Sequence, residues 1–181
     1  GLGVHERKLF APNPDEEDFF GYSVAIDGDY AIVSSAYEDA HNLENSGAAY
    51  IFNRVGTDWE LQDRLTAGEE NAVAEALFGA NVAINGDRTI VTAPFDNNRA
   101  GAAYIYFRNG EQWELQQRIT ADEEDANEDD RFGWSVAIND NYAAIGAALD
   151  DEIGFNTGAV YFYRWDGQSW ISQSKITAGE R

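Results

Sequence analysis

The sequence predicts an all-β fold built from repeated four-stranded units, the arrangement of a β-propeller. The phrase FGYSVAIDGDYAIVSSA at 20–36 recurs as FGANVAINGDRTIVTAP at 78–94 and FGWSVAINDNYAAIGAA at 132–148. A period of about 55 residues is typical of propellers, solenoids and other arrays. Each unit holds four short β-prone runs, and no window of comparable length has a convincing 3.6-residue apolar period. Together these observations favour an antiparallel array without helices.

The four strands of a unit follow from its turns. In the first unit the two leading runs are separated by Gly28 and Asp29, which tolerate the positive φ of a tight hairpin turn. The equivalent turns are NGD at 85–87 and NDN at 139–141. A longer polar loop and two further runs complete the unit, so the four strands are expected at 22–27, 30–36, 47–54 and 59–66. The Ala-rich segment 72–78 is expected to form at most a turn or two of helix.

The composition of the strands indicates that both faces of each unit are covered. The first two strands are nearly continuous apolar runs, and the third begins with small residues in GAAY, GAAY and GAVY at 47–50, 101–104 and 158–161. Gly and Ala allow close approach of a neighbour, and apolar residues on both faces are typical of a sheet packed between two others. Each unit is therefore expected to be one propeller blade.

FG followed by a hydrophobic hairpin and then GAAY resembles the FG-GAP repeat, which is the blade unit of integrin α-chain head propellers and of many bacterial and archaeal surface proteins. The resemblance covers residues 9–178. In the calcium-binding form of that family an acidic loop of the DxDxDG kind joins the first two strands, whereas this chain has only DGD, NGD or NDN there. The family's usual calcium site is therefore expected to be missing. The aspartate before FG is present as Asp18 and Asp130 but replaced by Ala76, so no common role is extended to all copies.

The chain is predicted to be a single, partial propeller domain. The segment VHERKLFA at 4–11 aligns with ELQDRLTA at 60–67, so residues 1–11 are expected to form the outer strand of a preceding blade. The three blades are then predicted at 9–66, 65–120 and 119–178. Propellers close with about 4 to 8 blades. We therefore expect a slice of a larger propeller, with ring closure by a second copy of the chain as the alternative and an open array as the third.

Charge and composition narrow the partners. The 33 acidic residues against 12 basic ones give a formal charge of −21. This charge disfavours nucleic acid as a binding partner, because nucleic acid is itself negative and attracts basic protein surfaces. No run approaches the ~20 apolar residues needed for membrane insertion. The acid-rich, Lys-poor composition fits either a high-salt environment or an ordinary acidic secreted protein. The absence of Cys excludes disulfides, thiolate zinc sites and Cys nucleophiles.

No catalytic constellation is apparent, so the sequence predicts a protein that is not an enzyme. His5 and His41 are the two histidines, they do not recur in the repeat, and no GxSxG elbow surrounds a serine. A hydrolase using paired carboxylates such as Asp129 and Asp130 is the least favoured interpretation.

Binding candidates are expected on one face. In a propeller the loops from strand two to strand three and from strand four to the next blade lie on the same face, and these loops hold most of the acidic residues. Trp59, Trp113 and Trp170 share one repeat position and are expected to pack between blades, whereas Trp134 and Trp165 lie beside loops. The predicted loop-face binding residues are Asp39, Asp96, Asp150, Trp134 and Trp165.

The acidic segment DEEDANEDD at 122–130 is a candidate calcium site. Ca²⁺ takes six to eight oxygen ligands, and this loop can supply several, although its spacing is not that of an EF-hand. The first ligands to test are Asp122, Asp125 and Asp129; calcium is the one cofactor considered. The repeat-fixed basic residues before each TA phrase are expected to pair with acids of the loop that follows them: Lys8, Arg64, Arg118 and Lys175.

These observations together predict a non-enzymatic binding or assembly module. The resemblance implies an extracellular or cell-surface location, with a protein or glycan on a surface held by the acidic loop face. A carbohydrate-binding, lectin-like propeller is the alternative. Further partners are other blades of a larger propeller or a second copy of the chain.

Overall fold

The structure is a computed structural model that describes residues 7–122 and 127–179. Within these residues the chain forms three four-stranded antiparallel sheets, each in the order of the sequence. Blade 1 contains β1 (Val24–Asp27), β2 (Tyr30–Ser35), β3 (Ala48–Val55) and β4 (Asp58–Leu65). Blade 2 contains β5 (Asn81–Asn85), β6 (Arg88–Ala93), β7 (Ala102–Asn109) and β8 (Gln112–Ile119). Blade 3 contains β9 (Phe132–Ile138), β10 (Tyr142–Ala147), β11 (Ala159–Trp165) and β12 (Trp170–Thr177). The predicted all-β fold of three propeller blades is confirmed.

The hairpin turns are those that the sequence predicts. Gly28 and Gly86 each have a φ of +55° in the two-residue turns of blades 1 and 2. In blade 3 the side-chain oxygen of Asn139 accepts hydrogen bonds from the backbone N–H groups of Asn141 (3.0 Å) and Tyr142 (2.8 Å), so an Asx turn replaces the glycine. The segment 72–78 contains no helix, and the short 3₁₀ helix η1 (Ala40–Asn42) lies in the β2–β3 loop.

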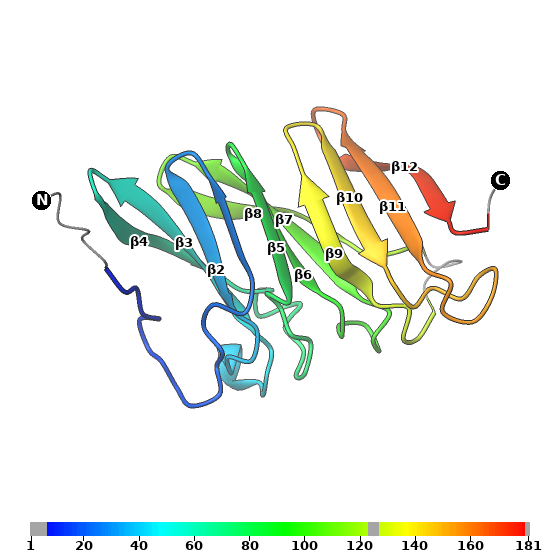
Figure 1. Cartoon of the computed structure of the whole chain (residues 1–181), viewed down its shortest axis with the longest axis horizontal. Helices are drawn as coiled ribbons and strands as arrows, with labels where there is room; N and C mark the ends of the chain where they lie inside the picture. Colours follow the sequence, from blue (N-terminus) through cyan, green and yellow to red (C-terminus); the bar gives the residue numbers. More distant parts are fainter. Residues whose placement is uncertain (1–6, 123–126, 180–181) are drawn as a thin grey trace, which may run out of the picture.

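The blades stack side by side with their first strands together along one edge (Figure 1), where β5 contacts both β1 and β9. One apolar cluster fills the space between blades 1 and 2, with Ile51 and Leu65 facing Phe78 and Tyr104. A second cluster of the same kind lies between blades 2 and 3. The FG phenylalanines Phe78 and Phe132 are fully buried in these clusters, which explains why the FG phrase recurs.

The tryptophans at the start of the fourth strand join each blade to the one before it. The indole N–H of Trp113 donates to Oε1 of Gln62 at 2.9 Å, and that of Trp170 donates to Oε1 of Gln116 at 3.0 Å. Both tryptophans are buried. The packing role predicted for this position is confirmed at these two junctions, whereas Trp59 is part of the free face of blade 1.

The outer strand expected at residues 1–11 stays a prediction, because the described residues contain no preceding blade. Residues 7–11 form no strand, and the remainder of the expected outer strand lies outside the described residues. A β-strand needs a neighbouring strand to pair with. Beside this segment the described residues contain no third strand of a preceding blade. Instead, Leu9 packs beside the buried residues Tyr50 and Phe52 of blade 1, and Arg7 pairs with Asp58 at 2.7 Å.

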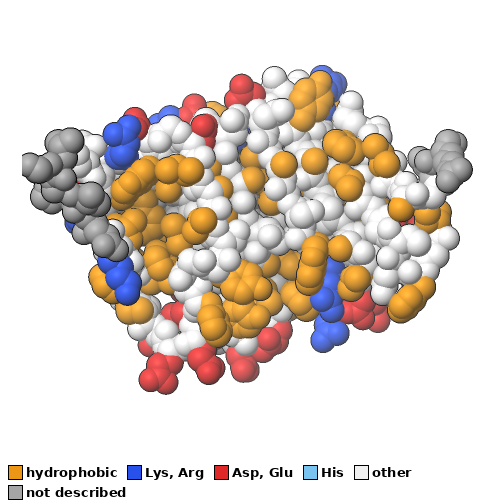
Figure 2. All heavy atoms as spheres, in the orientation of Figure 1, with side chains coloured by type: hydrophobic (Ala, Val, Ile, Leu, Met, Phe, Trp, Pro, Cys, Tyr) orange, Lys and Arg blue, Asp and Glu red, His pale blue; other side chains and the backbone are white. Residues whose placement is uncertain are grey.

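The loops from the second to the third strand and from the fourth strand to the next blade lie at the same end of the array (Figure 1). Acidic side chains line that end in the space-filling view (Figure 2). The predicted concentration of loops and acids at one end is therefore present. Among the described residues, no helix has the length and apolar character required to cross a membrane.

Candidate functional site

An open cavity of about 420 Å³ lies at the loop end of the inner strands. Blade 1 contributes Tyr22 and Tyr37, blade 2 contributes Ala80 and Phe95, and blade 3 contributes Trp134. In the space-filling view, hydrophobic side chains gather near the row of acids at this end (Figure 2). All three blades are therefore required to form the cavity.

The cavity exists because one repeat position alternates in size. The residue after FG is Tyr22 in blade 1, Ala80 in blade 2 and Trp134 in blade 3. Ala80 is small and buried, so the middle blade forms a floor between two large aromatic residues. Such a concave site lined by aromatic residues with a few polar groups is typical of ligand pockets.

The aromatic walls are held by contacts with their neighbours. The ring of Tyr37 makes edge contacts with Phe19 (5.1 Å between centroids) and with Tyr22 (5.6 Å). The guanidinium of Arg131 lies 4.7 Å from the ring centre of Phe95 and 5.3 Å from that of Trp134. Burial, followed by the neighbouring Tyr37, raises the pKa of Tyr22, so its hydroxyl stays neutral at physiological pH.

Trp134 is the predicted binding residue that the structure places in this cavity. The residue is 45 % exposed, which leaves part of its surface available to a ligand. The side-chain amide of Asn81 donates to the backbone carbonyl of Trp134 at 2.8 Å and thereby ties blade 2 to blade 3 at this point. The sequence did not identify Tyr22, Tyr37, Phe95 or Arg131, although the large–small–large alternation after FG was a signal for the cavity.

A smaller acidic hollow borders the aromatic cavity. It has a volume of about 200 Å³, is lined by residues 15–18 with Asp39, Glu44 and Asn45, and shares Tyr37 with the aromatic cavity. The predicted binding residue Asp39 is exposed there, and its carboxylate accepts the backbone N–H of Asn45 at 2.8 Å. A ligand that contacts Tyr37 can therefore meet aromatic rings on one side and carboxylates on the other.

The other two predicted aspartates are buried inside the blades. Asp96 accepts hydrogen bonds from the hydroxyl of Tyr104 (2.7 Å) and the guanidinium of Arg118 (2.9 Å). Asp150 accepts one from Tyr161 at 3.1 Å and pairs with Lys175 at 3.0 Å. These carboxylates are directed away from the loop surface. Their contacts fix the start of the loop between the second and third strands of blades 2 and 3.

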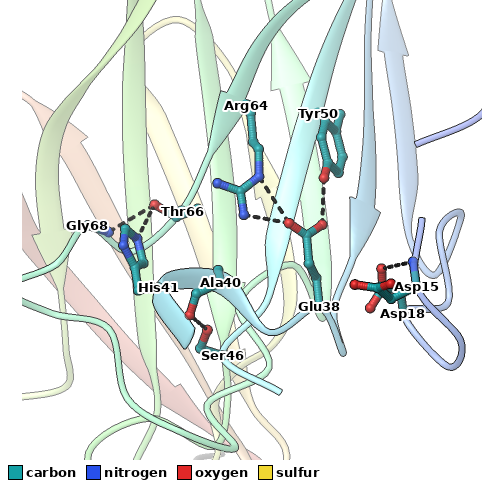
Figure 3. A network of polar contacts seen from close by, with 10 residues as sticks. All are labelled: Asp15, Asp18, Glu38, Ala40, His41, Ser46, Tyr50, Arg64, Thr66 and Gly68. Carbon is teal, nitrogen blue, oxygen red and sulfur yellow. Dashed lines mark hydrogen bonds and ion pairs between the residues drawn. The ribbon is translucent and has the colours of Figure 1, made fainter. Parts of the chain in front are cut away.

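Blade 1 has the same arrangement with Glu38, Tyr50 and Arg64 (Figure 3). Burial, with a contribution from Glu38, raises the pKa of Tyr50 to about 12. The prediction that the basic residues pair with the loop that follows them is wrong for Arg64, Arg118 and Lys175. Each of them pairs with the preceding loop of its own blade, because the fourth strand ends beside the tyrosine of the third strand, which already contacts that acid.

Trp165 lies away from this site, at the end of β11. Its ring packs on Trp170 with a centroid distance of 5.8 Å, and the guanidinium of Arg88 lies 5.3 Å above it. The third strand of a blade begins at the loop end and runs the full length of the sheet, so its last residue is at the opposite end. The structure therefore gives Trp165 a packing contact and does not bring it near Trp134.

The predicted calcium ligands are only partly described. Asp125 lies outside the described residues, Asp122 is exposed, and Asp129 pairs with Arg99 at 3.3 Å. In the part of the chain that the structure describes, no group of three or more His, Asp or Glu side chains could hold a metal ion. The pair Asp129 and Asp130 makes separate contacts, with Arg99 and with the loop backbone. The calcium site stays a prediction.

Asp18 and Asp130 close the loops that enter blades 1 and 3. Each carboxylate accepts a backbone N–H at 2.9 Å, from Asp15 and Asn127 respectively, and both side chains are buried. Desolvation by burial raises the pKa of both carboxyls above the ordinary value, against the opposing effect of these hydrogen bonds. The second blade has the buried Ala76 at this position and does without the contact.

The raised pKa of Asp130 predicts a specific pH dependence. Because the folded state binds this proton more tightly than the unfolded state, the carboxyl favours folding more as the pH falls through its raised pKa toward the ordinary value of 3.8. Asp130→Asn keeps an acceptor oxygen and removes the charge, so we expect a gain in the free energy of unfolding at pH 7 that disappears at pH 3. Urea unfolding at both pH values measures it, with the exposed Asp122→Asn as control. An equal effect at both pH values would contradict the assignment.

Comparison with known proteins agrees with the fold. The FG-GAP repeat model matches residues 4–52, 59–106 and 113–163. No curated protein matches the sequence. Among solved structures, a hypothetical selenium-binding protein from Sulfolobus tokodaii is similar, with a TM-score of 0.50 and 9 % identity over 83 % of this chain and 39 % of that one. A GH32 β-fructofuranosidase from Bombyx mori, a mutant in complex with sucrose, has a TM-score of 0.42 and 13 % identity over 88 % of this chain and 38 % of that one.

The chain thus spans about two fifths of the length of each of these two structures. At such low identity, the likeness to the Sulfolobus protein concerns the fold alone. The family matches are different in kind, because they cover most of the chain, fall on all three blades and include the FG and GAAY phrases that the structure places at the blade junctions. The chain belongs to the FG-GAP repeat family.

Proposed function

We propose that this chain is a non-enzymatic binding module that acts outside the cell or at a cell surface and holds its partner at the aromatic cavity. The observation that carries the proposal is the cavity itself, with Tyr22 and Trp134 on either side of Ala80. The residue that follows FG is part of the repeated framework of each blade. A change in the size of its side chain therefore alters the shape of the loop-end surface and leaves the strands of the blade unchanged. Family membership supports a binding role, since propellers of this repeat are often binding modules.

The chemistry of the partner follows from the two adjoining surfaces. The aromatic cavity favours an apolar or aromatic group, and the acidic hollow beside Tyr37 favours a cation. A formal charge of −21 further attracts basic partners over long distances at low salt. The partner that fits both is a protein segment in which an aromatic or aliphatic side chain lies next to Arg or Lys.

A glycan is the second candidate, and the exposed ring of Trp134 is the observation that favours it. A sugar ring can stack on such a face while its hydroxyls meet the carboxylates of the rim. The two candidates differ in their response to salt. Binding of a basic segment should weaken as salt screens the rim charges, whereas sugar stacking should change little.

The test is a binding screen with two probe sets, a peptide array that combines Arg or Lys with aromatic residues and a glycan array. Trp134→Ala is expected to weaken the binding of any hit at least tenfold, since truncating an interface tryptophan often costs about 2 kcal/mol or more. Phe155→Ala removes an exposed aromatic side chain from another loop and is the control.

The outcomes separate the candidates. Salt-sensitive peptide binding that depends on Trp134 supports the proposal, and Trp134-dependent glycan binding supports the lectin alternative. Hits that Trp134→Ala leaves unchanged, or no hits on either array, would count against this cavity as the binding site. The screen is repeated with calcium and with a chelator. This tests the calcium dependence of binding that is expected if Asp122, Asp125 and Asp129 hold the ion.

A further inference from the structure

The two ends of the blade array expose surfaces that are covered elsewhere in the same molecule. The first face of a blade is the side that the preceding blade covers in blades 2 and 3. In blade 1 this face is open, and Val24 and Ile26 are each 65 % exposed, whereas the equivalent Val82 and Ile84 of blade 2 are each 8 % exposed. Hydrophobic side chains are accordingly visible over the blade 1 end of the array (Figure 2).

The last face, which the following blade covers in blades 1 and 2, is open in blade 3. Ile176 is 53 % exposed there, whereas its equivalents Leu65 and Ile119 are 3 % and 4 % exposed. Val160 of the same face is also exposed. The three described blades therefore present one open first face and one open last face, which are the two halves of the junction that these blades already make twice.

The side chains at these ends repeat the contacts of the junction between blades 1 and 2. There, the ring of Trp113 makes an edge contact with Tyr30 at 5.9 Å between ring centres, and its indole N–H donates a hydrogen bond to Oε1 of Gln62 at 2.9 Å. Trp59 is the equivalent tryptophan on the open first face. The open last face carries the equivalents of Tyr30 and Gln62. They are Tyr142 and Gln173, which are the same residue types.

The backbone is prepared in the same way. At the junction of blades 2 and 3, Gly101 lies directly against the backbone of Phe132, whose N–H donates to the carbonyl of Ala100 at 2.8 Å. Gly158 is the equivalent glycine of blade 3, and the nearest atom to a Cβ built there is 3.3 Å away. A phenylalanine from another blade can occupy that space, and Phe20 is the FG phenylalanine of the open first face.

We propose that the last face of blade 3 binds the first face of blade 1 of a second copy, and that two such junctions close a ring of six blades. Both faces belong to the same three described blades, so two copies of these blades would leave neither face open. Six blades lie within the range in which propellers close. The open first face differs from the internal junctions at Phe52. The equivalent residues of blades 2 and 3, Tyr106 and Tyr163, donate hydroxyl hydrogen bonds to the preceding blade, which Phe52 cannot do. The junction between copies therefore lacks one hydrogen bond that the internal junctions have.

Charge makes this association depend on salt. Each copy carries a formal charge of −21, so two copies repel each other at low ionic strength. At 1 M salt the screening length falls to about 3 Å, which removes most of this repulsion while the apolar faces still attract. The fraction of paired copies is expected to rise with salt.

The experiment measures mass in solution, by light scattering in molar salt, for the wild type and two variants. Ile26→Glu charges the first face and Ile176→Glu charges the last face, and both positions are exposed in the single chain, so folding should not suffer. The control is Ile171→Glu, because Glu60 and Glu114 occupy this position in blades 1 and 2 and are exposed there. Circular dichroism verifies that each variant is folded.

The wild type and the control should have a mass near twice 20.0 kDa. Each face variant alone should be a monomer, because every junction needs both faces intact. An equimolar mixture of the two face variants should again give a two-chain mass, since it contains one intact pair of faces. A monomeric wild type would overturn the proposal and assign these faces to further blades; so would face variants that pair as the wild type does. Masses above two copies would overturn the closed ring.

Discussion

Gly101→Ala is expected to lower the free energy of unfolding by roughly 3 kcal/mol or more and to loosen blade 3 from blade 2. A Cβ at this position would overlap the carbonyl oxygen of Phe132 and lie 2.6 Å from its amide nitrogen. These are backbone atoms, so no side-chain rotation can relieve the clash. The φ of +95° adds strain, because residues with an L side chain rarely adopt it. Relief therefore requires that the strand entry at Phe132 move away from blade 2.

Gly110→Ala is the matched control for this prediction. Gly110 also has a positive φ, +67°, but no atom lies within 4 Å of the position of its Cβ. It therefore measures the conformational strain alone, about 1 kcal/mol. Urea unfolding of both variants gives the difference, which is the cost of the clash together with the greater backbone strain at the φ of Gly101. Equal losses would mean that the GA phrase is required for its backbone conformation and not for close approach of the blades.

The fold was predictable because the repeat states each structural requirement three times. A single hairpin with Asn, Asp and Gly in its turn is a weak signal, but three in register fix the strand order and the blade boundaries closely. The apolar first two strands and the small residues of GAAY correctly indicated that both faces of an internal blade are covered. The strand assigned to residues 1–11 stays a prediction, since the neighbouring strand with which it would pair belongs to a blade that the described residues do not contain.

The candidate site was less predictable because it depends on contacts between blades. Trp134 was identified from its position beside a loop, but Tyr22 and Ala80, which lie more than fifty residues away in the sequence, complete the cavity. The number of acidic residues in the loops located the acidic end correctly. It also predicted the same role, that of an exposed binding residue, for Asp96 and Asp39. Only the third strand, through Tyr104, distinguishes the buried carboxylate from the exposed one.

Trp165 illustrates a different limit. Its position beside a turn suggested a loop-face residue, but a blade has turns at both ends, and the sequence alone did not assign this one. The direction of β11 settles the matter, because the strand begins next to the acidic loops and ends at the opposite edge.

The largest side-chain effect is expected in the buried cluster of Asp96, Tyr104 and Arg118. The side chain of Asp96 is 3 % exposed, and Arg118 supplies its opposite charge at 2.9 Å. Arg118→Met keeps most of the side-chain volume and leaves this carboxylate without a cation. Removing one partner of a buried ion pair commonly costs about 3–5 kcal/mol, because the remaining charge is neither solvated nor paired. We expect a loss toward the lower end of that range, since Arg118 itself is partly exposed.

Blade 1 offers the matched comparison for this cluster. Glu38 and Arg64 make the same contacts in blade 1, but their side chains are 13 % and 41 % exposed, so water can solvate the carboxylate when the arginine is removed. Arg64→Met is therefore expected to cost about 1 kcal/mol. Chemical denaturation of both variants provides the comparison, and equal losses would contradict the role given to burial.

The double variant Asp96→Leu with Arg118→Met separates the loss of attraction from the cost of an unpaired charge. If the unpaired carboxylate is the source of the loss, replacing it with an apolar side chain of similar size should recover part of the stability that Arg118→Met removes. Tyr104 would then lose its acceptor, which limits the recovery by about 1–3 kcal/mol because its buried hydroxyl is left without that partner. A double variant less stable than either single variant would mean that the cluster stabilises the blade through its attraction. The acid–tyrosine–base arrangement would then be a source of stability in each blade as well as a means of fixing the loop.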